Sequence, residues 1–94
     1  MKLRYERGAL ADLEEIFAYI ARDNRPAAAR LVARIEQAAA KIAEMPYIGE
    51  AVRKGRFRRL PLGNYLIVYE VGEFEVVIHY VRHGARQRSW EGEE

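Results

Sequence analysis

The chain has 94 residues and a mass of 10.9 kDa, contains no cysteine, and carries a formal net charge of +2 at pH 7. Its length suits a single domain, residues 1–94, and its balance of 50% hydrophobic and 32% charged residues is that of a globular protein. The missing cysteine excludes disulfides and cysteine-based zinc or nucleophilic sites. No apolar run reaches the roughly 20 residues of a membrane span. The first residues lack the apolar segment of a signal peptide, so we expect a cytoplasmic protein.

Positive charge is unevenly distributed along the chain. Residues 1–50 hold eight basic and eight acidic side chains. Residues 51–69 hold five basic side chains and no acid, and residues 76–90 hold three arginines and no acid. Arginine presents a planar fork of donors that suits phosphate and carboxylate groups. The second half of the chain is therefore a candidate surface for an anionic partner.

The first half of the chain predicts a short strand and two helices. Alternation indicates a strand over residues 2–6, which Gly8 breaks, and from Ala9 the apolar spacing becomes helical. Pro26 ends this helix, and Asp23 or Asn24 is a candidate N-cap for a second helix over residues 26–44, in an antiparallel hairpin with a four-residue turn. The expected apolar faces are Leu10, Leu13, Ile16, Phe17 and Ile20 on the first helix, and Ala28, Leu31, Ile35, Ala38, Ile42 and Met45 on the second.

The second half of the chain has the period of β-strands. Three strands are predicted over residues 57–62, 65–71 and 74–82, and Pro61 places the first of them at a sheet edge. Gly63-Asn64 predicts the first turn, and Gly72-Glu73 predicts a type II′ hairpin. Residues 85–90 are expected to add one helical turn before an acidic tail.

These elements predict a two-layer α+β domain. An N-terminal strand is followed by an antiparallel helical hairpin and a three-stranded antiparallel meander, with the helices on one sheet face. The N-terminal strand is expected beside the meander, but its neighbour does not follow from the pattern. Residues 65–69 are apolar at both parities, so the second sheet face is a candidate docking surface.

Few residues are available for catalysis. The chain has one serine and no threonine, which leaves no nucleophile triad, and its scattered glycines form no phosphate-binding loop. His79 and His83 share a parity on one strand, about 13 Å apart, and no acid follows nearby, so no metal or cofactor is expected. What remains is a set of arginines with tyrosine and histidine. Such a set suits metal-free RNA cleavage, with His83 as acid or base and arginines as the phosphate clamp, and equally suits a protein interface.

Several segments resemble a known toxin family. The run ADLEEIFAYIA at residues 11–21, with Asn24, Pro26 and the alanines at 28 and 29, is similar to the opening of ParE toxins of the RelE/ParE superfamily. The same holds for MPYIG at 45–49, RRLP at 58–61, YLIVY at 65–69 and VRHGAR at 81–86. The resemblance spans about residues 2–88 in consistent order. It implies the RelE/ParE-like fold, in agreement with the periodicity.

The resemblance also implies a function and partners. The chain would be the toxin of a type II toxin–antitoxin system that inhibits DNA gyrase without catalytic residues. A ParD-like antitoxin would neutralise it in a hetero-oligomer and would alone contact operator DNA; no membrane is involved. The predicted target-binding residues are Arg82, His83, Arg86 and Trp90. The predicted antitoxin-binding residues are Arg53, Arg56, Arg58, Arg59, Leu66 and Val68.

An alternative is a RelE-like ribosome-dependent mRNA interferase. The lysine-rich site of part of that branch is missing here, because the one lysine of the sheet half, Lys54, lies in a loop. The nuclease would then use Arg58, Arg59, Arg82 and His83. The ending His-Gly-Ala-Arg at residues 83–86 resembles the ParE branch and favours gyrase inhibition.

Overall fold

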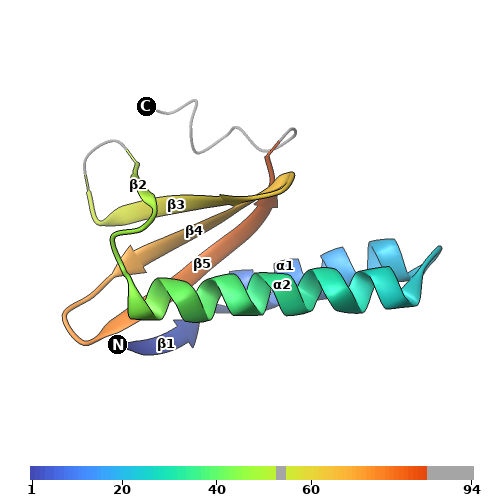
Figure 1. Ribbon diagram of the computed structural model, residues 1–94, viewed down its shortest axis with the longest axis horizontal. Coiled ribbons are helices and arrows are strands. Elements are labelled where there is room, and N and C mark those ends of the chain that lie inside the picture. The colour runs from blue at the N-terminus through green and yellow to red at the C-terminus, as the bar shows by residue number, and fades with distance from the viewer. Residues whose placement is uncertain (53–54, 85–94) are drawn as a thin grey trace.

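The computed structural model describes residues 1–52 and 55–84, which form two helices and a five-stranded sheet. Figure 1 shows both helices on one face of the sheet, so the predicted two-layer α+β architecture is confirmed. None of the helices in these two ranges is long and apolar enough to cross a membrane. The elements are β1 (Lys2–Tyr5), α1 (Arg7–Ala21), α2 (Arg25–Glu44), β2 (Glu50–Ala51), β3 (Phe57–Leu62), β4 (Tyr65–Val71) and β5 (Glu75–His83).

The strands follow the order β1-β5-β4-β3-β2. The predicted antiparallel meander β3-β4-β5 forms the centre. β1 pairs in parallel with β5, from Lys2 opposite Glu75 to Tyr5 opposite Ile78, which supplies the neighbour that the sequence left open. β2 was not predicted, because two residues carry no period. It pairs with Arg58 and Arg59 of β3 and is the outermost strand, so the prediction that the strand 57–62 lies at the sheet edge is wrong. Pro61 lies beyond the residues that pair with β2.

The two hairpin turns of the meander differ from each other. Gly63 has φ +60° in the predicted Gly63-Asn64 turn, a conformation that glycine adopts without strain. The predicted type II′ turn at Gly72 is wrong, because that turn needs a positive φ at its glycine and Gly72 has none. The connection runs from Gly72 to Phe74 instead. The backbone N–H of Lys2 donates to the Phe74 carbonyl at 3.2 Å. This carbonyl, which would accept a hydrogen bond across a two-residue hairpin, is therefore bonded to β1.

The helix boundaries have local causes. α1 begins at Arg7, two residues earlier than predicted, and Gly8 lies inside it. A Cβ on Gly8 would lie 3.2 Å from the His79 carbonyl oxygen, so the glycine allows α1 to approach β5 closely. Asn24 is the N-cap of α2, where its Oδ1 accepts a hydrogen bond from the Ala27 N–H at 3.0 Å. The turn between the helices therefore has three residues, 22–24, instead of four.

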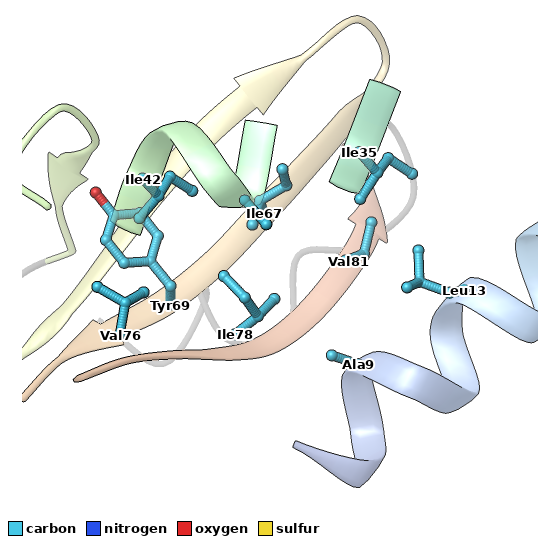
Figure 2. Close-up of a cluster of buried hydrophobic side chains, with 10 residues drawn as sticks. Ala9, Leu13, Ile35, Ile42, Ile67, Tyr69, Val76, Ile78 and Val81 are labelled. Carbon is cyan, nitrogen blue, oxygen red and sulfur yellow. The ribbon is translucent and has the colours of Figure 1, made fainter. Parts of the chain in front are cut away.

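The hydrophobic core lies between the helices and the sheet. Figure 2 shows the side chains of α1 and α2 meeting those of β4 and β5. Leu10 and Met45, both predicted to be in the core, are 49% and 50% exposed. Ala9 takes the position against β5, which turns Leu10 about 100° away, and Met45 follows the last residue of α2. The buried cluster is Ala9, Leu13, Ile35, Ala39, Ile42, Ile67, Tyr69, Val76, Ile78 and Val81.

Candidate functional site

A β-bulge in β5 decides which face its side chains occupy. Tyr80 lies opposite Val68 and Ile78 lies opposite Tyr69, so His79 is an extra residue without a partner in the ladder. The bulge shifts the parity: Ile78 faces the core before it and Val81 faces the core after it. The prediction that His79 and His83 share one side of the strand is therefore wrong.

The sheet face without helices, here called the open face, is less apolar than the sequence suggested. Val68 and Val77 on this face are only 5% exposed, whereas Phe57 and Tyr80 are 40% and 38% exposed. The exposed large hydrophobic side chains of this face are thus aromatic. By register and alternation, the open face carries Phe57, Arg59, Leu66, Val68, Glu70, Val77, His79, Tyr80 and Arg82.

The arginines near the open face have acidic partners within the chain. These acids come from outside the acid-free segments of the sequence, so the fold neutralises charge that the sequence shows as unbalanced. Solvent-exposed pairs of this kind contribute about 0–1 kcal/mol each. The pairs are Arg56 with Glu70, Arg59 with Glu50, and Arg82 with Asp12, each through the arginine Nε at 3.3 Å.

Arg58 has a structural position away from the open face. Its Nε donates to the Gly49 carbonyl at 2.9 Å, and its guanidinium lies 5.1 Å from the centre of the Tyr47 ring. The Tyr69 hydroxyl donates to the Pro46 carbonyl at 2.7 Å and accepts from the Gly49 N–H at 2.9 Å. Arg58 and Tyr69 therefore hold the loop that follows α2.

The four residues predicted for a nuclease do not assemble into one site. Arg58 and His83 both lie on the helix side of the sheet, opposite β4 residues four positions apart, which separates them by about 13 Å along the strands. Arg59 and Arg82 lie on the open face. His83 is thus separated from Arg58 and Arg59, and of the proposed clamp only Arg82 lines the same groove as His83.

A different histidine has a carboxylate beside it. His79 Nε2 lies 3.0 Å from Glu70 Oε1, and both side chains are 21% exposed. The Phe57 ring packs edge-on against the imidazole with centroids 5.0 Å apart. The sequence did not predict this pair, because its two residues lie on neighbouring strands. The available signal was Glu70, an acid within the otherwise apolar strand β4. The arrangement can orient an imidazole for proton transfer.

A groove of about 640 Å³ lies between α1 and the end of β5. β1 ends opposite Ile78, so beyond that residue no strand from the described ranges lies beside the outer edge of β5. Asp12 takes that place: its Oδ2 accepts from the Val81 N–H at 2.9 Å and from Arg82 Nε at 3.3 Å. The groove is also lined by Glu15, Ile16, Tyr19, Tyr65 and His83.

Some predicted residues lie outside the described ranges. These are Arg53, Arg86 and Trp90, together with the helical turn expected at residues 85–90. Of the residues in the described ranges, no three histidines or acids gather where they could hold a metal ion. The described target-binding candidates, Arg82 and His83, start from opposite faces of β5, yet both side chains line the groove between α1 and β5.

Comparison with known proteins gives a consistent result. The family model described as ParE toxin of type II toxin-antitoxin system, parDE, matches residues 3–88. The chain is 40% identical over 88 residues to a protein of Sinorhizobium fredii (strain NBRC 101917 / NGR234) named "Putative toxin Y4kP". That alignment covers 92% of this chain and 91% of the relative.

Two solved structures share the fold. A structure of the chromosomal ParDE system from P. aeruginosa superposes with a TM-score of 0.76 at 22% identity, covering 88% of this chain and 95% of that one. A chain of the RelBE2 toxin–antitoxin complex from Mycobacterium tuberculosis gives 0.69 at 20% identity, covering 87% and 95%. Because the family model matches residues 3–88, almost the whole chain, this chain belongs to the ParE toxin family of type II toxin–antitoxin systems.

Proposed function

We propose that this toxin acts by binding and inhibiting DNA gyrase, with no catalytic residue of its own. The observation that carries the proposal is that Arg58 lies about 13 Å along the strands from His83 and Arg59 lies on the opposite face, so that of the predicted clamp only Arg82 lies beside the imidazole. The family match and the ParE-like ending at residues 83–86 support the same target. Arg82, His83, Arg86 and Trp90 are the proposed gyrase contacts.

A ParD-like antitoxin is the proposed neutralising partner, and operator DNA is contacted through it alone. Its tail covers the open face, where Phe57 and Tyr80 present exposed aromatic surface. Acids of the tail that bind Arg56 or Arg59 replace carboxylates that are already in place, so this exchange adds little net electrostatic attraction. The complex is therefore expected to persist in high salt, because burial of apolar surface dominates its stability.

The gyrase proposal is tested with the purified chain and relaxed plasmid. Wild-type toxin should block supercoiling or accumulate cleavage complexes. Arg86→Ala should weaken this effect, while the matched control Arg34→Ala, on the exposed side of α2, should retain it. The proposal fails if gyrase is unaffected while ribosome-bound mRNA is cut at defined codon positions.

The second candidate, a ribosome-dependent mRNA interferase, is favoured by one contact. Glu70 orients the His79 imidazole through Nε2, which leaves Nδ1 to exchange protons, and Arg56 bonds the second carboxylate oxygen. This nuclease would centre on His79 instead of the predicted His83. His79→Gln should abolish mRNA cleavage while His83→Gln preserves it. Cleavage that survives His79→Gln would remove this candidate.

A further inference from the structure

The loop between α2 and β2, residues 45–49, carries exposed apolar side chains although its backbone is firmly held. Figure 1 shows it running from the end of α2 to the outermost strand of the sheet. Tyr47 is 69% exposed and Ile48 is 41% exposed. The loop backbone is bonded by the Tyr69 hydroxyl and by the Arg58 guanidinium. Apolar side chains presented in one fixed arrangement bind a partner at a low ordering cost, as in a protein interface.

The path of this loop leaves no room for a side chain at Gly49. A Cβ there would lie 2.6 Å from the Tyr69 hydroxyl oxygen and 2.7 Å from the Arg59 carbonyl oxygen. The Ile48 N–H also donates to the Met45 carbonyl at 3.0 Å. The loop backbone therefore packs directly on β3 and β4, and the exposure of its apolar side chains is a property of the packed fold.

Arg58 beside this loop differs from the other arginines of residues 55–84. Arg56, Arg59 and Arg82 are each paired with an acid. Within the described ranges Arg58 has no acidic partner, because its Nε donates to a backbone carbonyl. The sheet half of the molecule thus keeps one positive charge that the fold does not neutralise, and it lies next to exposed apolar side chains.

The outer end of the Arg58 guanidinium is accessible and oriented. Its Nη1 and Nη2 make no hydrogen bond within the described part of the chain. The one buried side-chain polar atom without a partner in that part is His83 Nδ1, so both Arg58 nitrogens contact solvent. The Tyr47 ring lies 5.1 Å from the guanidinium carbon and covers a face of the planar group. The N–H bonds point outward in the plane, where two of them can donate to both oxygens of a carboxylate.

We propose that residues 45–49 and Arg58 bind a segment of a protein partner that carries a carboxylate beside an aliphatic side chain. The carboxylate accepts from Nη1 and Nη2, and the aliphatic side chain packs on Tyr47 and Ile48. Nucleic acid fits this surface less well, because Glu44 and Glu50 border the loop and repel a run of phosphates.

This surface is separate from the other proposed contacts. Arg58 lies on the helix side of the sheet, whereas the antitoxin tail is proposed to cover the open face, and β4 separates β3 from the proposed gyrase contacts on β5. The sequence predicted Arg58 as an antitoxin contact through its charge. The structure adds the apolar loop beside it, and the inference does not rest on gyrase as the target.

The test uses the full chain labelled for NMR and the peptide acetyl-Leu-Glu-Leu-amide. Its comparison peptide, acetyl-Leu-Gln-Leu-amide, has nearly the same shape without the charge. The glutamate peptide should give saturable shifts at Tyr47, Ile48 and Arg58, and the glutamine peptide should bind about two- to fivefold more weakly. This difference should shrink in 0.5 M NaCl, because salt screens the ion pair.

Three outcomes of the titration would overturn the proposal. The first is equal binding of the two peptides at low salt, which would show that the Arg58 charge is not used. The second is a set of shifts confined to another surface. The third is inorganic phosphate that binds as tightly as the glutamate peptide and shifts the same residues, which would show a general anion site.

Variants separate the apolar contact from the charged one. Tyr47→Ala removes exposed ring surface but no backbone bond, and should weaken binding of the glutamate peptide about two- to fivefold. The matched control is Tyr19→Ala, because Tyr19 is also 69% exposed and its ring also lies beside an arginine, Arg22, at 5.9 Å. This control should bind as the wild type does. Unchanged binding in Tyr47→Ala contradicts the proposed contact.

Arg58→Gln removes the charge and keeps an amide that can donate to the Gly49 carbonyl. In this variant the glutamate peptide should bind no more tightly than the glutamine peptide, and a preference for glutamate that survives would refute the role of Arg58. The Gly49 amide signal reports whether the loop keeps its place, and if the loop moves, Tyr47→Ala and the salt dependence decide. None of these measurements involves gyrase or antitoxin, so their failure is distinguishable from failure of the proposed function.

Discussion

Removing the hydroxyl of Tyr69 should destabilise the whole domain by detaching the loop that follows α2. The Tyr69 side chain is fully buried, and Figure 2 shows its oxygen at the margin of the core cluster. The hydroxyl donates to Pro46 at 2.7 Å and accepts from the buried Gly49 N–H at 2.9 Å. In Tyr69→Phe both bonds are lost at about 1 kcal/mol each, and the unpaired Gly49 N–H adds a further cost, so we expect a loss of about 2–3 kcal/mol.

Urea unfolding followed by circular dichroism measures this loss. For a domain of this size, 2–3 kcal/mol corresponds to a fall in Tm of roughly 10–20 °C. Tyr65→Phe is the matched control, because the Tyr65 hydroxyl has no hydrogen bond within the described ranges, and its effect should stay within about 0.5 kcal/mol. If the two variants were equally stable, the Arg58 bond to the Gly49 carbonyl would suffice to hold the loop, and the reasoning would be refuted.

Three further changes test other contacts. Asn24→Ala should lower the free energy of unfolding by about 1 kcal/mol through loss of the α2 cap, measured by urea titration against Asn24→Asp, which keeps a capping oxygen. Asp12→Ala should cost about 2 kcal/mol in the same titration, because the buried Val81 N–H loses its acceptor, and Asp12→Asn should recover part of it. Burial, and then the charge of Glu36, raise the pKa of Tyr5 above its ordinary value of 10.0. The folded state therefore favours neutral Tyr5. This contribution to stability is complete below pH 10 and is lost as the pH rises through the higher pKa of the folded state. Between pH 9 and pH 11.5 the Tyr5→Phe variant should therefore lose less stability than the wild type.

The local periodicity of the sequence predicted the elements of the fold. It did not predict the contacts between segments that are far apart in the sequence. Both helices, the Asn24 cap and the meander follow from spacing and turn residues that lie within a few positions of one another. The place of β1 beside β5 depends on pairing across some seventy residues, for which the sequence holds no periodic signal. The bulge at His79 interrupts a pattern that the sequence presents as continuous alternation, so the prediction that His79 and His83 share one side of the strand is wrong.

The candidate sites were less predictable than the fold. Arginine-rich segments were recognised, but their pairing with Glu50, Glu70 and Asp12 depends on strand register and on the path of α1. Glu15 lies off the apolar stripe of α1 and is exposed, and it also lines the groove beside β5. Its place in a groove depends on β1 ending before β5 does, which leaves room beside the outer edge of that strand. Which residues line such an edge depends on where the neighbouring strands end. The sequence of a single segment does not contain that information.

The internal ion pairs change what charge can contribute to recognition by this toxin. An acidic partner at Arg56 or Arg59 exchanges one carboxylate for another, so the attraction it gains is largely offset by the pair it breaks. Its binding energy must then come mainly from covering Phe57 and Tyr80, and the arginines determine orientation more than affinity.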